Sequence, residues 1–422
     1  MPFARRAELL LLLALSAHAG MSNFFRASYS VLGPELTRDL SLTPQSLSVA
    51  AGSFFMALAV LQIPVGMLFD RFGPRRTVLA LSGLSIVGSV LHGMAASPAM
   101  LIASRFLIGF GCAGSFVSAI VLCSYWFAGP RFTTNLSWVF AVSNVGTFLA
   151  STPLAGATEL LGWRVVSYGQ GALMAVVALI FAWGAQDFPP DQPRPVRPKE
   201  SARQVFRGFG QVLRAPGMWQ VLAMHMFIYA SMMTVLGLWA GPYLKDVHGF
   251  GAVERGNILF GMTVAQTLGL LAAGPLERAL NSRKWVALGG ACITITLLGL
   301  LALLSHPSAA VAVTLLVLHC GLTSYSIVVV AHGRSLYADH LAGRGVTLVN
   351  LSQLTGLTLL PILTGAVIGT FPVANGTSPE IAYRWAFGCI AAALACGAAV
   401  YLTSRDAKPQ RAVAQPTATV GK

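Results

Sequence analysis

Charged residues are scarce in this chain of 422 residues. Only 10% of the residues are Asp, Glu, Lys or Arg, whereas 55% are hydrophobic. A water-soluble protein surrounds its core with a polar shell, and so few charged side chains cannot form one over this length. The composition excludes an ordinary soluble protein and indicates one that crosses the lipid bilayer several times.

Polar interruptions of the apolar sequence are also few. Spanning the hydrocarbon layer takes about 20 mostly apolar residues, and twelve segments meet this requirement. Continuous runs of this length exclude the alternating strands of a membrane barrel and predict an all-α polytopic fold. The segments cover residues 8–33, 45–68, 77–97, 99–123, 133–157, 163–184, 217–240, 253–275, 285–305, 308–331, 346–370 and 382–403.

Acidic residues number 14 against 28 Lys and Arg, which gives a net charge of +14. In a soluble protein this excess would suggest a nucleic-acid partner, so the positions of the charges decide its meaning. With a cytoplasmic N-terminus, 21 basic residues fall in cytoplasmic segments, five in external segments and two inside spans. The asymmetry predicts a multi-pass protein of a bacterial-type inner membrane with both termini cytoplasmic, and no nucleic-acid partner. The external five are Arg38, Arg164, Lys245, Arg255 and Arg384; the two inside spans are Arg26 and Arg105.

Motifs for catalysis or cofactor binding are missing. The six cysteines show no metal-ligand spacing, and neither a nucleophile–base–acid set nor a Gly-x4-Gly-Lys nucleotide loop occurs. His225 lies between Met224 and Met226, but consecutive helical positions point in different directions and do not favour a shared metal ion. We therefore expect no enzymatic activity, no cofactor and no metal site.

A proline-rich basic segment divides the spans into two sets of six. The predicted organisation is an N-terminal half over residues 1–184, a cytoplasmic linker over 185–216, a C-terminal half over 217–404 and a disordered cytoplasmic tail over 405–422. Within the linker, residues 203–213 have the apolar spacing of an amphipathic helix on the membrane surface, with an unstructured tether as the alternative. A secretory signal cleaved near 17–19 is another interpretation of the N-terminus, but its removal would leave an odd number of spans.

A charged loop follows the second span, where four charges lie between two apolar segments. It contains Gly66, Asp70, Arg71, Gly73, Arg75 and Arg76. A weaker copy with Glu277 and Arg278 follows the eighth span, 207 residues further along the chain. The repeat predicts two halves of related structure.

The pattern Gly-x3-Asp-Arg-x-Gly-x-Arg-Arg in a chain of six plus six spans resembles the major facilitator superfamily (MFS) of secondary transporters. The resemblance implies two pseudo-symmetric six-helix halves that rock around a site near the bilayer midplane. It also implies that the loop residues, with Glu277 and Arg278, form a conformational latch that holds the outward-open state.

Arg26 and Arg105 are the candidate substrate-binding residues. A charged side chain at the centre of a span costs about 3 kcal/mol on insertion scales, so each marks a candidate site. All fourteen acids fall in loops, tails or helix ends, so an anion is the partner that a guanidinium fork would recognise. Arg105 also resembles the fourth-helix arginine of the superfamily, which organises contacts between helices, and that structural role is the alternative.

Other polar residues inside the spans complete the predicted cavity. Asn23, Tyr29, Tyr229, Tyr325 and Asn350 are candidate substrate contacts, together with Asn144, Gln266 and Gln353. His18 and His319 are candidate proton carriers because imidazole titrates near neutral pH, with simple packing as the alternative. His225 is weighed in the same way, and packing is favoured for it. The coupling ion, H+ or Na+, stays open.

The sequence thus predicts a monomeric secondary transporter that takes up a small organic anion across the inner membrane. An exporter of amphipathic compounds is the alternative within the same class. A non-transporting scaffold or sensor with the same fold is the alternative from a different class.

Overall fold

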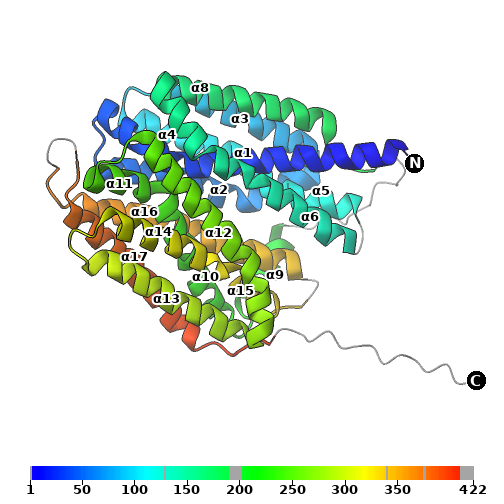
Figure 1. Cartoon of the computed structure of the whole chain (residues 1–422). Coiled ribbons are helices and arrows are strands. Elements are labelled where there is room, and N and C mark those ends of the chain that lie inside the picture. The colour runs from blue at the N-terminus through cyan, green and yellow to red at the C-terminus, as the bar shows by residue number, and fades with distance from the viewer. Residues whose placement is uncertain (1, 128–129, 190–201, 339–340, 374–376, 409–422) are drawn as a thin grey trace, which may run out of the picture.

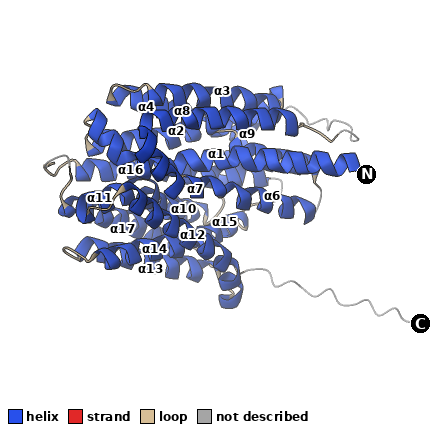
Figure 2. Cartoon of the chain, turned by 45° about the horizontal axis from the view of Figure 1, so that its top comes forward, coloured by secondary structure: helices blue, strands red, loops and turns tan. Residues whose placement is uncertain are grey.

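The computed structural model describes residues 2–127, 130–189, 202–338, 341–373 and 377–408. These residues form helices joined by short turns, and no strand is assigned within the described ranges, as Figure 2 shows. The all-α fold expected from the apolar runs is confirmed. The end of the predicted tail, residues 409–422, and most of the proline-rich part of the linker lie outside the described residues.

The N-terminal half contains the first six spans. Several of its helices begin with proline at the first turn and a hydroxyl side chain before it; Thr43, for example, accepts a hydrogen bond from the Ser46 backbone N–H. Such caps satisfy backbone donors that the helix itself leaves free. The helices are α1 (Pro2–Leu40), α2 (Pro44–Phe72), α3 (Pro74–Gly93), α4 (Pro98–Cys112), α5 (Ser115–Trp126), α6 (Pro130–Ser143), α7 (Val145–Leu149) and α8 (Thr152–Gly184).

The fifth and sixth spans form one nearly continuous apolar stretch. In the part of the chain that the structure describes, eleven stretches are long and apolar enough to cross a membrane, because Thr134–Gly184 is a single stretch. Within it Gly162 has φ +78°, a conformation that residues with a Cβ adopt at a cost. This single glycine reverses the chain direction, so the stretch supplies two of the twelve predicted spans with almost no loop between them.

The C-terminal half repeats the arrangement. Its seventh span extends beyond the predicted residue 240, because the π-helical turn η1 (Val235–Trp239) joins α10 (Met218–Thr234) to α11 (Ala240–His248). The remaining helices are α12 (Ala252–Leu280), α13 (Arg283–Leu303), α14 (Ala309–Leu322), η2 (Thr323–Tyr325), α15 (Ser326–Arg334), α16 (Ala342–Ile368) and α17 (Glu380–Leu402).

The linker contains a helix, α9 (Ala202–Leu213), at the position expected for an amphipathic helix. Its Val212 is fully buried in a cluster with Met218, Leu341 and Val349 of the C-terminal half. Part of the apolar face of α9 is therefore covered by protein rather than by lipid.

The two halves lie side by side, the blue-to-teal N-terminal half above the green-to-red C-terminal half in Figure 1. We call the end of the bundle with the charged loop the Asp70 end, and the opposite end the Glu35 end. The start of α1 lies at the Asp70 end, where Arg131 of α6 pairs with Glu8. The end of α17 lies beside the start of α13, where the Lys284 ammonium donates to the Ser404 carbonyl at 2.8 Å.

Candidate functional site

A cavity of about 2880 Å³ separates the two halves. Its deep part is lined by Arg26 of α1, Tyr229 of α10 and Asn350 of α16, so both halves contribute. Its mouth is lined by Asp70 and Asp187, which places the opening at the Asp70 end. The volume is well above the 300–1,000 Å³ of a typical ligand pocket, as expected for a cavity that is open to water.

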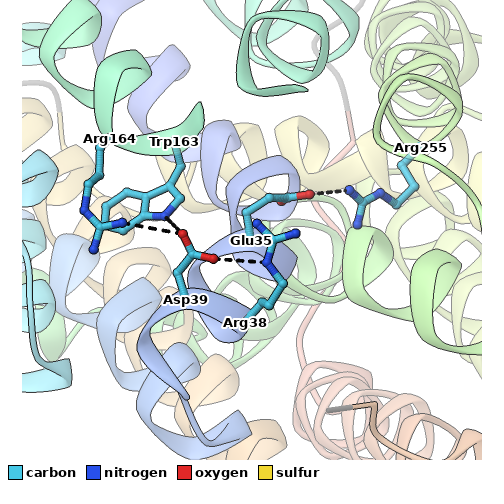
Figure 3. A network of polar contacts seen from close by, with 6 residues as sticks. All are labelled: Glu35, Arg38, Asp39, Trp163, Arg164 and Arg255. Atoms are coloured by element: carbon cyan, nitrogen blue, oxygen red, sulfur yellow. Dashed lines mark hydrogen bonds and ion pairs between the residues drawn. The ribbon is translucent and has the colours of Figure 1, made fainter. Parts of the chain in front are cut away.

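The Glu35 end is closed by polar contacts between the halves. Arg255 of α12 pairs with Glu35 of α1 at 2.9 Å, and the Arg255 side chain is only 4% exposed. Figure 3 shows this pair beside a second network within the N-terminal half, in which Asp39 accepts hydrogen bonds from Arg38, Trp163 and Arg164. The Glu35–Arg255 pair is the one ion pair between the halves among the described residues.

Close backbone approaches complete this closure. The Gly241 N–H of α11 donates to the Ser30 hydroxyl of α1 at 2.9 Å, and a Cβ at Gly241 would overlap the Ser30 carbonyl oxygen. Similarly, a Cβ at Gly52 of α2 would lie 2.9 Å from the Thr358 carbonyl oxygen of α16. The cavity is therefore closed at the Glu35 end and open at the Asp70 end.

Arg26 lies at the deep end of the cavity. Its guanidinium carbon is 4.8 Å from the centroid of the Phe116 ring and 6.0 Å from that of Phe55. Tyr229, from the opposite half, lies within hydrogen-bonding reach of the guanidinium, whereas Nε has no hydrogen-bond partner. The guanidinium of this cavity-lining residue therefore retains an unsatisfied donor.

Arg105, also predicted to bind substrate, is 2% exposed and does not line the large cavity. Its guanidinium donates to the Phe25 carbonyl oxygen at 3.1 Å and lies 4.3 Å from the centroid of the Tyr29 ring and 4.9 Å from that of Phe54. Tyr29 is likewise buried outside the cavity. In this state both residues connect α1, α2 and α4, which is the structural role weighed as the alternative for Arg105.

The other residues predicted to contact substrate also divide into those that line the cavity and those that do not. Asn23 lines the cavity and donates to the Ser143 carbonyl oxygen and hydroxyl, each at 3.2 Å, and Asn350 also lines it. Tyr325 is buried among Val221, Ile228 and other apolar residues and does not reach the cavity. The structure thus brings Asn23, Arg26, Tyr229 and Asn350 together with Asn144, Gln266 and Gln353.

The two histidines proposed as proton carriers lie outside the cavity. His18 is 1% exposed and shares a hydrogen bond of 2.9 Å with the Ser82 hydroxyl. His319 is fully buried on α14. His225, weighed from the sequence both as a titrating group and as a metal ligand, lines the cavity on α10. The described residues contain no group of three metal-binding side chains.

The charged loop lies open at the cavity mouth. Asp70 is exposed and forms none of the ion pairs found among the described residues. Arg75 donates its backbone N–H to the Asp187 carboxylate at 2.8 Å, and its guanidinium donates to the Ala182 carbonyl oxygen. Gly66, Arg71, Gly73 and Arg76 also line the mouth.

The second copy of the loop is held more tightly. Glu277 pairs with Arg283 at 2.7 Å rather than with the adjacent Arg278, which is exposed. Nearby, Asp406 accepts the Lys284 backbone N–H at 3.0 Å. Burial acts to raise the pKa of Asp406, but this hydrogen bond and others from the Ser282 side chain and the Arg283 backbone hold it below its usual value.

The Glu35–Arg255 pair has no clear signature in the sequence. Arg255 falls near a span boundary and counts there among the external basic residues. Its partner Glu35 lies 220 positions earlier in the chain, in the N-terminal half. Only the packing of α12 against α1 brings the two side chains together.

Comparisons with known proteins agree with this architecture. The chain is 28% identical over 236 residues to the probable sulfoacetate transporter SauU of Cupriavidus necator, an alignment covering 53% of this chain and 54% of SauU. It thus spans about half the length of that relative. It is also 28% identical over 286 residues to the probable nitrate/nitrite transporter NarK2 of Mycobacterium tuberculosis, covering 65% of this chain and 68% of NarK2.

Among solved structures, a bacterial homolog of the human lysosomal transporter Spinster superposes with a TM-score of 0.75 at 20% identity. That match covers 93% of this chain and 95% of the other, and it establishes the shared fold. The family model described as Major Facilitator Superfamily matches residues 11–352. The chain therefore belongs to the Major Facilitator Superfamily of transporters.

Proposed function

We propose that this transporter takes up a small organic anion, which Arg26 binds at the deep end of the cavity. The observation that carries this proposal is the isolation of Arg26 from carboxylates. Among the described residues that line the cavity, the acids are Asp70 and Asp187, and both lie at the mouth. A desolvated guanidinium needs an acceptor, and a carboxylate or sulfonate matches its donors in a bidentate way.

The charge balance of the cavity supports the same class of substrate. Arg71, Arg75, Arg76 and Arg344 line the mouth, so basic groups outnumber acidic ones along the route to Arg26. A concave surface of one sign raises the local concentration of ions of the opposite sign. The names of SauU and NarK2, which refer to sulfoacetate and to nitrate or nitrite, agree with an anionic substrate.

We further propose that the Asp70 end faces the cytoplasm. The basic residues of the loop at this end follow the positive-inside pattern of short cytoplasmic loops. The state described here is then inward-open, and substrate entering from outside is released past Asp70.

Uptake into proteoliposomes tests the proposal. Purified protein is reconstituted, and labelled sulfoacetate, tartrate, glucarate and nitrate are supplied outside. We expect Arg26→Gln to lower uptake of the preferred anion at least about 10-fold, the effect of losing about 1.4 kcal/mol of binding, and Arg26→Lys to restore only part of it.

Arg38→Gln provides a matched control, because Arg38 lies on the same helix but its side chain is 71% exposed at the Glu35 end. Uptake that is unchanged in Arg26→Gln would contradict the role of Arg26. Efflux of amphipathic compounds without anion uptake would favour an exporter, and a lack of any transport would favour a scaffold or sensor.

A further inference from the structure

We propose that His225 is the proton-binding residue that couples anion uptake to proton entry. This inference rests on the proposed function, since it assumes that an anion occupies the cavity. It identifies the coupling ion as H+ and the transported pair as one anion with one proton.

His225 is the one histidine among the described residues that line the cavity. Its side chain is 3% exposed, yet its Nδ1 atom has no hydrogen-bond partner. Leaving a buried polar atom without a partner costs free energy, so such an atom marks a place where a ligand or proton is received. Gln353 of α16 lies within hydrogen-bonding reach of the same imidazole.

The position of His225 relative to Tyr229 connects it to the anion site. The two residues are four positions apart on α10 and therefore lie on the same face, one turn apart. Tyr229 reaches Arg26 across the cavity. A small anion bound at Arg26 is then attracted by a positive charge on His225, whereas an empty cavity leaves the buried imidazole neutral.

Other titratable groups lie on the helices around α10 and across the cavity. On the helices that pack against α10, His332 of α15 bonds to Tyr401 of α17 and Tyr325 of η2 is buried in an apolar cluster. Arg344 of α16 lies at the mouth, and Arg334 of α15 donates to the Tyr337 carbonyl. Across the cavity, Arg26 and Cys112 are the titratable groups that face it at depth.

The coupling follows from reciprocity between the two ligands. If protonation of His225 strengthens anion binding, then anion binding strengthens protonation by the same factor. The proton adds to Nδ1 from water on the outer side and leaves the same nitrogen to water at the Asp70 end. The imidazole returns to its starting form after each cycle, and nothing is oxidised or reduced.

The test measures proteoliposome uptake of whichever of the four labelled anions the wild-type protein transports fastest, beginning with sulfoacetate. The external buffer is made about two pH units more acidic than the vesicle lumen. We expect the gradient to accelerate wild-type uptake about 10-fold. In His225→Gln this acceleration should disappear, because glutamine does not titrate. Exchange of internal for external anion needs no net proton movement, so its rate should fall by less than about 10-fold in the same variant.

His319→Gln is the matched control, because His319 is a buried histidine outside the cavity, and it should keep the full acceleration. His225→Asn serves as a second variant, and thermal unfolding checks that both variants at this position are folded. A direct readout is the pH change on adding sulfoacetate to wild-type protein in weak buffer, with about one proton taken up per anion bound and none in His225→Gln.

The outcomes separate the two proposals. Equal acceleration by the gradient in His225→Gln and wild type overturns the role of His225 and leaves anion transport intact. Wild-type vesicles that transport none of the panel anions overturn the proposed function, and the role of His225 falls with it.

Discussion

At the scale of single residues, Arg26 and Arg105 show how far hydropathy can locate a site. The sequence places both guanidinium groups at a similar depth in the membrane, because depth follows from counting residues along a helix. It does not give the rotation of each helix about its axis, which depends on side chains from other helices. Arg26 faces the cavity, while Arg105 points toward the Phe25 carbonyl oxygen. For the same reason, the sequence alone does not distinguish Tyr229, which lines the cavity, from Tyr325, which does not.

Arg105 is therefore expected to affect stability more than substrate affinity. Arg105→Met removes the hydrogen bond to Phe25 and the stacking on Tyr29, and should destabilise the protein by about 1.5–3 kcal/mol, the range for hydrogen bonds to charged groups. Thermal unfolding in detergent measures this change. Arg26→Met, which breaks no such backbone contact, should leave the midpoint nearly unchanged; a larger loss in Arg26→Met than in Arg105→Met would contradict this assignment.

At the scale of elements, the closure of the Glu35 end depends on an ion pair and on glycines. The Glu35–Arg255 pair joins α1 to α12, and Gly241 allows α11 to approach α1. The spans themselves are predictable because their apolar runs are long. The contacts between the spans are not predictable from the sequence, because each contact joins positions far apart in the chain and depends on how the two halves pack.

Removing one partner of the ion pair should open the Glu35 end. Arg255→Gln leaves Glu35 partly buried without its charge partner, and the closed end should lose roughly 1–3 kcal/mol, or about 5- to 160-fold in population. Spin-label distances between α1 and α12 at this end measure the shift. The double variant Glu35→Gln/Arg255→Gln should shift less than Arg255→Gln, and an equal or greater shift would show that the pair does not hold this end closed.

Gly241 offers a steric test of the same closure. Gly241→Ala should favour the state in which α11 and α1 have separated, because the added Cβ overlaps the Ser30 carbonyl oxygen. Labelling of a cysteine placed in the outer half of the cavity reports this opening. Gly261→Ala on α12 is the matched control, since a Cβ there meets no atom within 4 Å; equal labelling of the two variants would argue against the contact.

At the scale of the whole molecule, the proposed transport requires the two ends to open and close in turn. Among the described residues, Asp70 has no ion-pair partner while its end is open. The resemblance to other family members implies that it gains partners when that end closes. Asp70→Asn should therefore lower the maximal uptake rate about 10-fold, because the state with this end closed loses about 1.4 kcal/mol of stabilisation. The KM for the anion should stay nearly unchanged. A change in the choice of anion at an unaltered rate would contradict this division between movement and recognition.

The size of the open cavity has a consequence for the water it holds. At about 30 Å³ for each molecule, 2880 Å³ corresponds to about 100 waters. Closing the Asp70 end must return most of them to bulk solution, so the transition performs osmotic work. A polymer too large to enter the cavity, added on the side of the Asp70 end, should pull the protein toward its closed form by drawing that water out. The rocking of two halves can then be followed as a change in hydration.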